Sequence, residues 1–85
     1  MGRSARAKPR RLGAKLKAIR LKRLGFSQTE MWRALKLNVN YSAISQYETG
    51  KREPDVLVLL KYARLAGVTI DDLVDDKINL PKWKG

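Results

Sequence analysis

Residues 27–54 read SQTEMWRALKLNVNYSAISQYETGKREP, and this stretch decides the fold. Its first four residues fit a capping box, in which the Ser27 side chain accepts a hydrogen bond from the Glu30 amide and the Glu30 side chain accepts one from the Ser27 amide. Met31 and Leu35 follow at the spacing of an inward-facing helical stripe. The pattern therefore predicts that a helix begins directly after Ser27.

A second helix is predicted in the same stretch, after a break. The asparagines of residues 38–40 favour turns and left-handed backbone, so they interrupt the first helix. Ser42 is the expected cap of a short helix over about residues 42–49, in which Ile44 and Tyr47 face inward. A glycine directly after this helix favours its end. Two helices joined by a turn are therefore expected here.

Three further helices are predicted around this stretch. Apolar stripes over about residues 12–24 and 56–66 each end at a glycine, and Pro54 suits the first position of the second of these helices. A capping pattern at residues 69–72 begins a short helix over about residues 70–75. The inward positions are Leu12, Leu16 and Ile19 in the first stripe and Val56, Leu59, Leu60, Ala63 and Ala66 in the second.

These patterns predict an all-α fold, with one compact five-helix domain over residues 12–76. No stretch alternates apolar and polar residues as a half-buried strand would. Residues 1–11 are basic and lack apolar periodicity, so we expect a flexible basic arm. Residues 77–85 form a C-terminal tail without a clear period.

The charge is divided unevenly along the chain. Lys and Arg number 19 against 8 Asp and Glu, which gives a net charge of +11. Residues 1–52 hold 14 of these basic side chains and 2 acidic ones, whereas residues 53–85 hold 5 and 6. A basic half joined to a neutral half indicates one face built for a polyanion.

Composition also excludes several classes of protein. The chain contains no cysteine and no histidine, so it offers no disulfide, no thiolate or imidazole metal site and no histidine base. We expect no cofactor and no enzymatic activity. The longest apolar run, Val56–Leu60, is far shorter than the roughly 20 residues of a membrane span. No secretory signal follows the basic start, so a cytoplasmic protein without a membrane partner is predicted.

Several spaced residues together resemble a known family. They are Ser27-Gln28, then Ile44-Ser45-x-Tyr47-Glu48-x-Gly50-Lys51-Arg52-x-Pro54, and later Leu59, Ala63, Gly67-Val68 and Asp72-Leu73. This pattern resembles the Cro and phage-repressor (XRE) type of helix-turn-helix protein over about Leu12 to Val74. The resemblance implies a lambda-repressor-like helix-turn-helix domain. It also implies a sequence-specific double-stranded DNA-binding transcription regulator, a repressor, with the helix at about 42–49 in the major groove.

The chain departs from the family pattern at one place. Residues 37–40 replace the usual glycine between the second and third helices, and the stretch from Gln28 to Ile44 is about two residues longer than usual. Trp32 occupies a position where the family commonly has a small alanine. We expect the bulky ring and the longer turn to be connected.

The third helix carries the candidate base-reading residues. With Ile44 and Tyr47 inward, its outer side chains are short or amide-bearing, which suits the donors and acceptors of base edges. Asn40, Ser42, Ser45 and Gln46 are of this type, and Tyr41 lies beside them. The resemblance implies that Tyr41, Ser42 and Gln46 contact bases.

Other positions are assigned to the DNA backbone or to structure. Lys51 and Arg52 lie in the turn after the third helix, where phosphate contacts position a protein without specifying sequence. The resemblance implies a phosphate contact for Gln28 and a buried pairing of Glu48 with an arginine of the first helix, here Arg20. Arg33, Lys36 and the basic arm are further candidates for phosphate or minor-groove contacts.

Three alternatives remain at this point. An antitoxin-like module would bind a protein partner as well as DNA. An RNA-binding protein would need exposed aromatic side chains for stacking, and Tyr41 alone is well placed. A metal-dependent enzyme would need the acidic cluster of Asp71, Asp72, Asp75 and Asp76, but two of these positions cap a helix.

Assembly is also left open by the sequence. One recognition helix covers only a few base pairs, so we expect a weak or DNA-assisted homodimer. The apolar residues left for an interface are Val74, Ile78, Leu80 and Trp83. The alternative is that the tail folds back over its own core.

Overall fold

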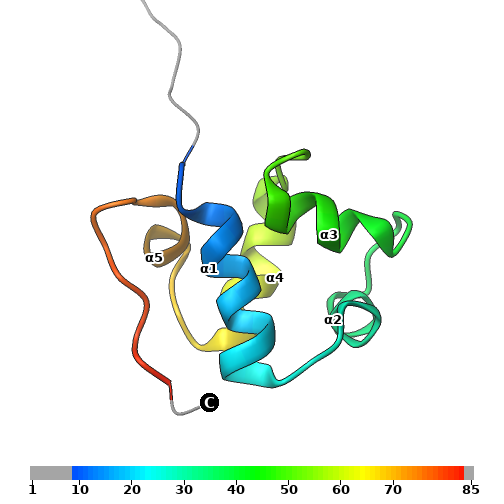
Figure 1. The fold of residues 1–85 in the computed structure, drawn as a ribbon, viewed down its shortest axis with the longest axis horizontal. Coiled ribbons are helices and arrows are strands. Elements are labelled where there is room, and N and C mark those ends of the chain that lie inside the picture. Colours follow the sequence, from blue (N-terminus) through cyan, green and yellow to red (C-terminus); the bar gives the residue numbers. More distant parts are fainter. Residues whose placement is uncertain (1–8, 84–85) are drawn as a thin grey trace, which may run out of the picture.

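The computed structural model describes residues 9–83 and shows the all-α fold that the sequence predicts. No strand is present in this range. The elements are α1 (Leu12–Ala18), η1 (Ile19–Leu24), α2 (Gln28–Leu35), α3 (Ser42–Thr49), α4 (Val56–Ala66) and α5 (Ile70–Val74). The helix formed by α1 and η1 crosses the middle of the molecule, with α2 and α3 on one side of it and α5 and the tail on the other (Figure 1). None of these helices is long and apolar enough to cross a membrane.

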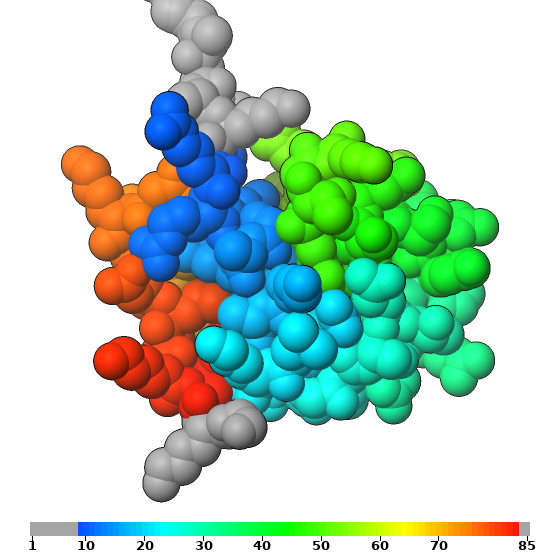
Figure 2. All heavy atoms as spheres, in the orientation of Figure 1, coloured from blue at the N-terminus to red at the C-terminus, as the bar shows by residue number. Residues whose placement is uncertain are grey.

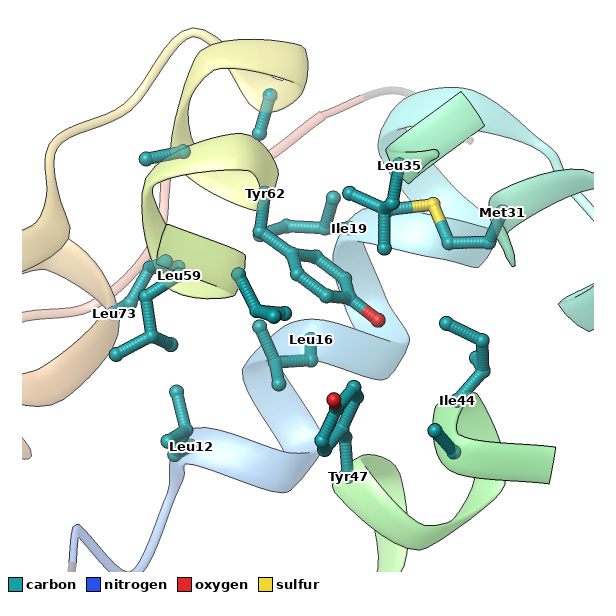
Figure 3. Packing of buried hydrophobic residues seen from close by; sticks show 14 residues of the cluster. Leu12, Leu16, Ile19, Met31, Leu35, Ile44, Tyr47, Leu59, Tyr62 and Leu73 are labelled. Atoms are coloured by element: carbon teal, nitrogen blue, oxygen red, sulfur yellow. The ribbon is translucent and has the colours of Figure 1, made fainter. Parts of the chain in front are cut away.

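One apolar core joins all five α-helices (Figure 3). Leu16, Ile44, Tyr62 and Leu73 come from α1, α3, α4 and α5, and none exposes measurable surface. Burying a side chain of this size stabilises the fold by roughly 1.5–3 kcal/mol. Helices of 5 to 11 residues are too short to be stable alone in water, so this shared core holds them in place.

The first predicted helix changes its winding half-way. We expected one regular helix over about residues 12–24, but Ile19–Leu24 is a π-helix. It ends at Gly25, whose φ of 68° is left-handed, and the Phe26 amide donates to the Arg20 carbonyl at 2.8 Å. Arg20 is buried in this wide turn. A pattern of apolar residues does not predict the burial of a charged side chain.

The start of α4 also differs from the prediction. Val56 was expected to face inward, but it is 63% exposed, and the buried face begins at Val58. Asp55 caps the helix by accepting from the Val58 amide at 3.0 Å, so Pro54 lies before the cap and not at the first helical position. A run of consecutive apolar residues leaves the phase of a helix ambiguous, and here the cap and the buried Tyr62 set it.

Both predicted capping boxes are confirmed. The Ser27 hydroxyl accepts from the Glu30 amide at 3.1 Å, and the Glu30 carboxylate accepts from the Ser27 amide at 2.7 Å. Thr69 and Asp72 exchange the same two bonds at the start of α5. These helix starts depend on residues three apart, so local sequence predicts them well.

The tail after α5 turns back along α1 (Figures 1 and 2). Leu80 and Trp83 are half-buried and pack against the core. With Ala14 and Ala18 of α1 they line one hollow. Leu80 and Trp83 therefore cover this chain's own core, which is the alternative to the interface expected from the sequence.

Candidate nucleic-acid interface

The third helix spans Ser42–Thr49, as predicted, but its cap is not Ser42. The carboxamide oxygen of Asn40 accepts from the Ser42 amide at 2.9 Å. Tyr41 stands at the cap position with helical backbone angles and no capping bond from its side chain. An asparagine side chain readily accepts a hydrogen bond from the backbone amide two residues later, whereas Ser42 already lies inside the helix. The Asn40 side chain is thus hydrogen-bonded to the backbone at the start of α3, and Ser42 is an exposed residue of its first turn.

The turn before α3 is held by the residue that departs from the family pattern. The Trp32 indole nitrogen donates to the Val39 carbonyl at 2.7 Å, and the Trp32 ring meets the Tyr41 ring edge-on with centroids 6.5 Å apart. The ring and the longer turn are therefore in direct contact, as we expected. The left-handed residue here is Lys36, with φ 53°, and not one of the asparagines. Within residues 9–83 it is the only non-glycine with positive φ.

Glu48 and Arg20 form the expected pair. Their side chains are 4% and 8% exposed, and the Arg20 Nε and Nη2 donate to the two Glu48 carboxylate oxygens at 2.6 and 3.0 Å. The same arginine donates to the Phe26 carbonyl at 3.0 Å. The Glu48 hydrogen bonds raise the pKa of Arg20 above its ordinary value, so the guanidinium stays charged. This bidentate pair fastens α3 to η1.

Gln28 belongs to the same cluster. Its amide nitrogen donates to a Glu48 carboxylate oxygen at 3.4 Å, and the residue is half-buried. The cluster therefore joins η1, α2 and α3 through three side chains. The phosphate contact implied for Gln28 stays a prediction.

The sequence analysis missed Gly13, which lies where α1 meets α3. A Cβ built at this position would lie 2.5 Å from the Glu48 carbonyl oxygen and 3.1 Å from the Tyr47 carbonyl oxygen. A glycine inside a helix costs about 1 kcal/mol relative to alanine, so it indicates a packing requirement. A glycine within the apolar stripe of the first helix was therefore the feature of the sequence that could have predicted this close contact. Gly13 allows the backbone of α3 to approach α1 closely.

The candidate contact residues lie on or beside α3. Tyr41 is 56% exposed, and Asn40 and Ser42 are also exposed, whereas Ser45 and Gln46 are half-buried. Lys51 and Arg52 are exposed in the turn that follows, and the Arg52 amide donates to the Gln46 carbonyl at 3.2 Å. In Figure 2, α2, α3 and this turn occupy the same side of the molecule. The structure thus brings the predicted base-reading and phosphate residues onto neighbouring surface.

The carboxylates of the acidic cluster, at the other end of the molecule, accept hydrogen bonds from backbone amides. The carboxylates of Asp72, Asp75 and Asp76 accept from the amides of Thr69, Lys77 and Arg10, respectively. Within residues 9–83, no three acidic side chains are grouped to hold a metal ion. These carboxylates have structural hydrogen-bonding partners.

A family comparison now identifies the chain. Residues 16–73 match the family model described as helix-turn-helix, which covers most of the sequence. This chain belongs to the XRE-type helix-turn-helix family. A search of curated proteins gives no match.

Solved helix-turn-helix structures share the arrangement. The P22 c2 repressor in complex with synthetic operator 9T and Tl+ is 28% identical, with a TM-score of 0.65 over 76% of this chain and 94% of that one. The BldD DNA-binding domain of S. venezulae is 30% identical, with a TM-score of 0.62 over 79% and 96%. The solution structure of the P22 c2 repressor DNA-binding domain is 24% identical, with a TM-score of 0.67 over 89% and 96%, and supports the fold alone.

Proposed function

We propose that this protein is a sequence-specific regulator that binds double-stranded DNA and represses transcription, with α3 in the major groove. One observation carries the proposal. The inner face of α3 is locked to α1 and η1 through Gly13 and the Arg20–Glu48 pair, while its outer face is polar. A major groove about 12 Å wide admits one such helix. The likeness to the P22 c2 repressor bound to an operator supports the same role.

The proposal assigns two kinds of contact. Tyr41, Ser42 and Gln46 contact base edges, which specify sequence. Lys51 and Arg52 contact phosphates, which position the helix without reading it. The two kinds of contact differ in their dependence on DNA sequence and on salt, so binding measurements separate them.

The test compares Gln46→Ala with Lys51→Ala on a site selected from random DNA and on an unrelated duplex. With about 4–6 phosphate contacts, the wild type should show a log–log slope of affinity against salt of roughly −4 to −5. Gln46→Ala should lose about 1–3 kcal/mol on the selected site and little on the unrelated duplex. Lys51→Ala should weaken both and flatten the slope by about one unit.

Two results would contradict the proposal. A slope near zero for the wild type would show that the protein does not bind DNA through phosphates. An equal loss for Gln46→Ala on both duplexes would show that α3 does not read the sequence. Repression itself is tested by a reporter placed behind the selected site, which should be silenced by the wild type and not by Gln46→Ala.

The proposal includes a homodimer assisted by DNA, because one α3 covers too few base pairs to select a site. Three of the four residues expected for pairing, Val74, Leu80 and Trp83, pack on the chain's own core. The start of α4 offers another surface, where Val56 and Leu57 are 63% and 65% exposed. A twofold pairing through these side chains is self-complementary, as a homodimer requires.

The two surfaces are distinguished by Leu57→Ser and Ile78→Ser. If α4 pairs the copies, Leu57→Ser should abolish cooperative binding to an inverted repeat with half-sites about 10–10.5 base pairs apart, and Ile78→Ser should not. The reverse result would support pairing through α5 and the tail. A selected site without symmetry, with a one-to-one complex in sedimentation, would show a monomer.

A further inference from the structure

A hollow of about 570 Å³ separates α1 from the tail. The tail runs beside the first helix from the start of α1 towards η1, on the side opposite α3 (Figure 1). Lys15 and Ala18 line the hollow from the helix, and Leu80 and Trp83 line it from the tail. We call this space the tail hollow. Its volume is that of a small-molecule site, which ranges from about 300 to 1,000 Å³.

Lys15 brings a buried positive charge to the tail hollow. The residue is 3% exposed, and its ammonium donates to the Asp72 carbonyl at 2.7 Å and to the Asp75 carbonyl at 2.9 Å. Both acceptors are uncharged, and in the part of the chain that the structure describes Lys15 forms no ion pair. An ammonium has three N–H donors, so a third donor remains after these two bonds.

The charge of Lys15 is incompletely balanced by its neighbours. Burial lowers the pKa of Lys15 below its ordinary value, and the nearby Arg11 charge lowers it further. Three nearby aspartates, Asp72, Asp75 and Asp76, oppose this shift. Their carboxylates accept hydrogen bonds from backbone amides and form no ion pair with Lys15. A buried charge without a partner is unfavourable, so an anion in the tail hollow would stabilise the charged form of Lys15.

The other charges around the tail hollow have the same sign. Arg11, Lys22 and Lys82 line it and are exposed. Among the described residues that line the hollow, four are therefore basic and none is acidic. The Arg11 guanidinium is fixed near Lys15 by its bond to the Asp76 carbonyl at 2.8 Å. Basic groups that converge on one concave site attract anions to it.

The walls between these charges are apolar. Ala14 and Ala18 line the tail hollow from α1, and the half-buried Leu80 and Trp83 line it from the tail. The two alanines leave space that longer side chains on α1 would fill. A ligand with an apolar body would remove the remaining exposed surface of Leu80 and Trp83 from water, which is favourable. Apolar walls with a few fixed polar groups are the usual composition of small-molecule sites.

We propose that the tail hollow binds a small organic anion with an apolar body, such as an aryl or alkyl carboxylate. The carboxylate lies against Lys15 and Arg11, and the apolar body lies against Leu80 and Trp83. None of the described residues that line the tail hollow belongs to α2 or α3, so this site is separate from the proposed DNA interface and its test does not depend on DNA binding.

The test uses the full-length chain, with 4-phenylbutyrate as the probe. The chain has two tryptophans, and their indole N–H signals in heteronuclear NMR report separately on the tail hollow, through Trp83, and on the turn before α3, through Trp32. Trp83→Phe and Trp32→Phe assign the two signals. The probe should shift the Trp83 signal with a dissociation constant of about 1 mM, the scale for a ligand of about 12 non-hydrogen atoms. The Trp32 signal should not move.

Two other compounds separate the charge of the probe from its apolar body. The uncharged 4-phenylbutanamide should bind at least about tenfold more weakly, because it lacks the charge-assisted bonds to Lys15 and Arg11. Acetate, which has the charge alone, should give no saturable shift at the same concentrations. Equal binding of the amide and the acid would overturn the proposal. A short peptide of alternating Glu and Leu that shifts the Trp83 signal when 4-phenylbutyrate does not would indicate a protein partner and would also overturn it.

The matched substitutions are Lys15→Met and Lys17→Gln. Lys15→Met removes the buried charge and should weaken binding of 4-phenylbutyrate at least about tenfold, while binding of the amide changes less than about twofold. Lys17→Gln removes the same charge from an exposed residue of α1 that does not line the tail hollow, and it should weaken binding less than about twofold because solvent screens this charge.

Two exposed lysines keep the test independent of folding, since Lys15→Met also removes two hydrogen bonds to the end of α5. Lys22→Gln and Lys82→Gln should each weaken 4-phenylbutyrate binding about two- to fivefold, in proteins whose circular dichroism matches that of the wild type. Equal effects of these substitutions and Lys17→Gln would show general attraction by the net charge and overturn the site. The absence of a saturable Trp83 shift at about ten times the expected dissociation constant would overturn it as well.

Discussion

The helices α2 and α3 differ in what holds them in place. α2 begins with its own capping box and buries Met31 and Leu35. α3 has no capping bond from its cap residue Tyr41, no acidic side chain in its first turn and no basic one in its last. It is placed by Gly13 and Arg20 from the first helix and by the turn that Trp32 holds. α3 buries Ala43, Ile44 and Tyr47, so it does not lack apolar contacts. What it lacks is a capping box of its own, and its start and its orientation therefore depend on its neighbours.

The largest effect on the placement of α3 is expected when the cation that pairs with Glu48 is removed. Arg20→Met leaves a buried carboxylate without its cation, which should cost about 3–5 kcal/mol of unfolding free energy. Urea denaturation followed by circular dichroism measures this loss. The double variant Arg20→Met/Glu48→Leu should recover most of it, because apolar replacement of a buried pair is often neutral. A loss below about 1 kcal/mol in the single variant would show that the pair does not hold α3.

Gly13→Ala tests the close approach of α1 and α3 through the sign of its effect. Helix propensity alone predicts a gain of about 1 kcal/mol. The 2.5 Å approach to the Glu48 carbonyl oxygen predicts instead a loss of about 1–3 kcal/mol by overpacking. Ala14→Gly, at an exposed position of the same turn, calibrates propensity in the same denaturation experiment. A more stable Gly13→Ala protein would refute the contact.

A smaller effect is expected from Trp32→Phe. The substitution keeps an aromatic ring but removes the donor to the Val39 carbonyl, a loss of about 1 kcal/mol in stability. Because this bond holds the turn that leads into α3, discrimination between selected and unrelated duplexes should fall as well. Trp83→Phe in the tail is the control and should leave discrimination unchanged. Unchanged discrimination in Trp32→Phe would separate the turn from DNA reading.

The smallest effect concerns α2 and appears only in acid. The hydrogen bond from the Ser27 amide holds the pKa of Glu30 below its ordinary value. The folded pKa is lower than the unfolded one, so this stabilisation is present above the unfolded pKa and is lost as pH falls through the folded pKa. The melting temperature of the wild type relative to Glu30→Gln should therefore be flat above about pH 5 and decline below it. A constant difference down to pH 2 would contradict this role of the carboxylate.

Most residues that act within one turn were predictable. The Ser27 and Thr69 caps and the span of α3 follow from spacings of three or four residues, although the cap expected at Ser42 was wrong. The family follows from a longer pattern, which extends from Ser27 to Leu73. The base and phosphate contacts stay predictions, since they require DNA. Val56 shows the limit of periodicity, because a continuous apolar run does not state which of its members faces inward.

The sequence by itself determined where the helices begin and end, because capping and glycine termination act between near neighbours. Only the tertiary structure decided the π-turn at Arg20, the approach of Gly13 to Glu48 and the hydrogen bonds that Asp76 accepts from the Arg10 and Arg11 amides. Each of these depends on residues that are 28 or more positions apart. A local sequence pattern does not predict such contacts, because each contact stabilises the protein only after the core has brought the two segments together.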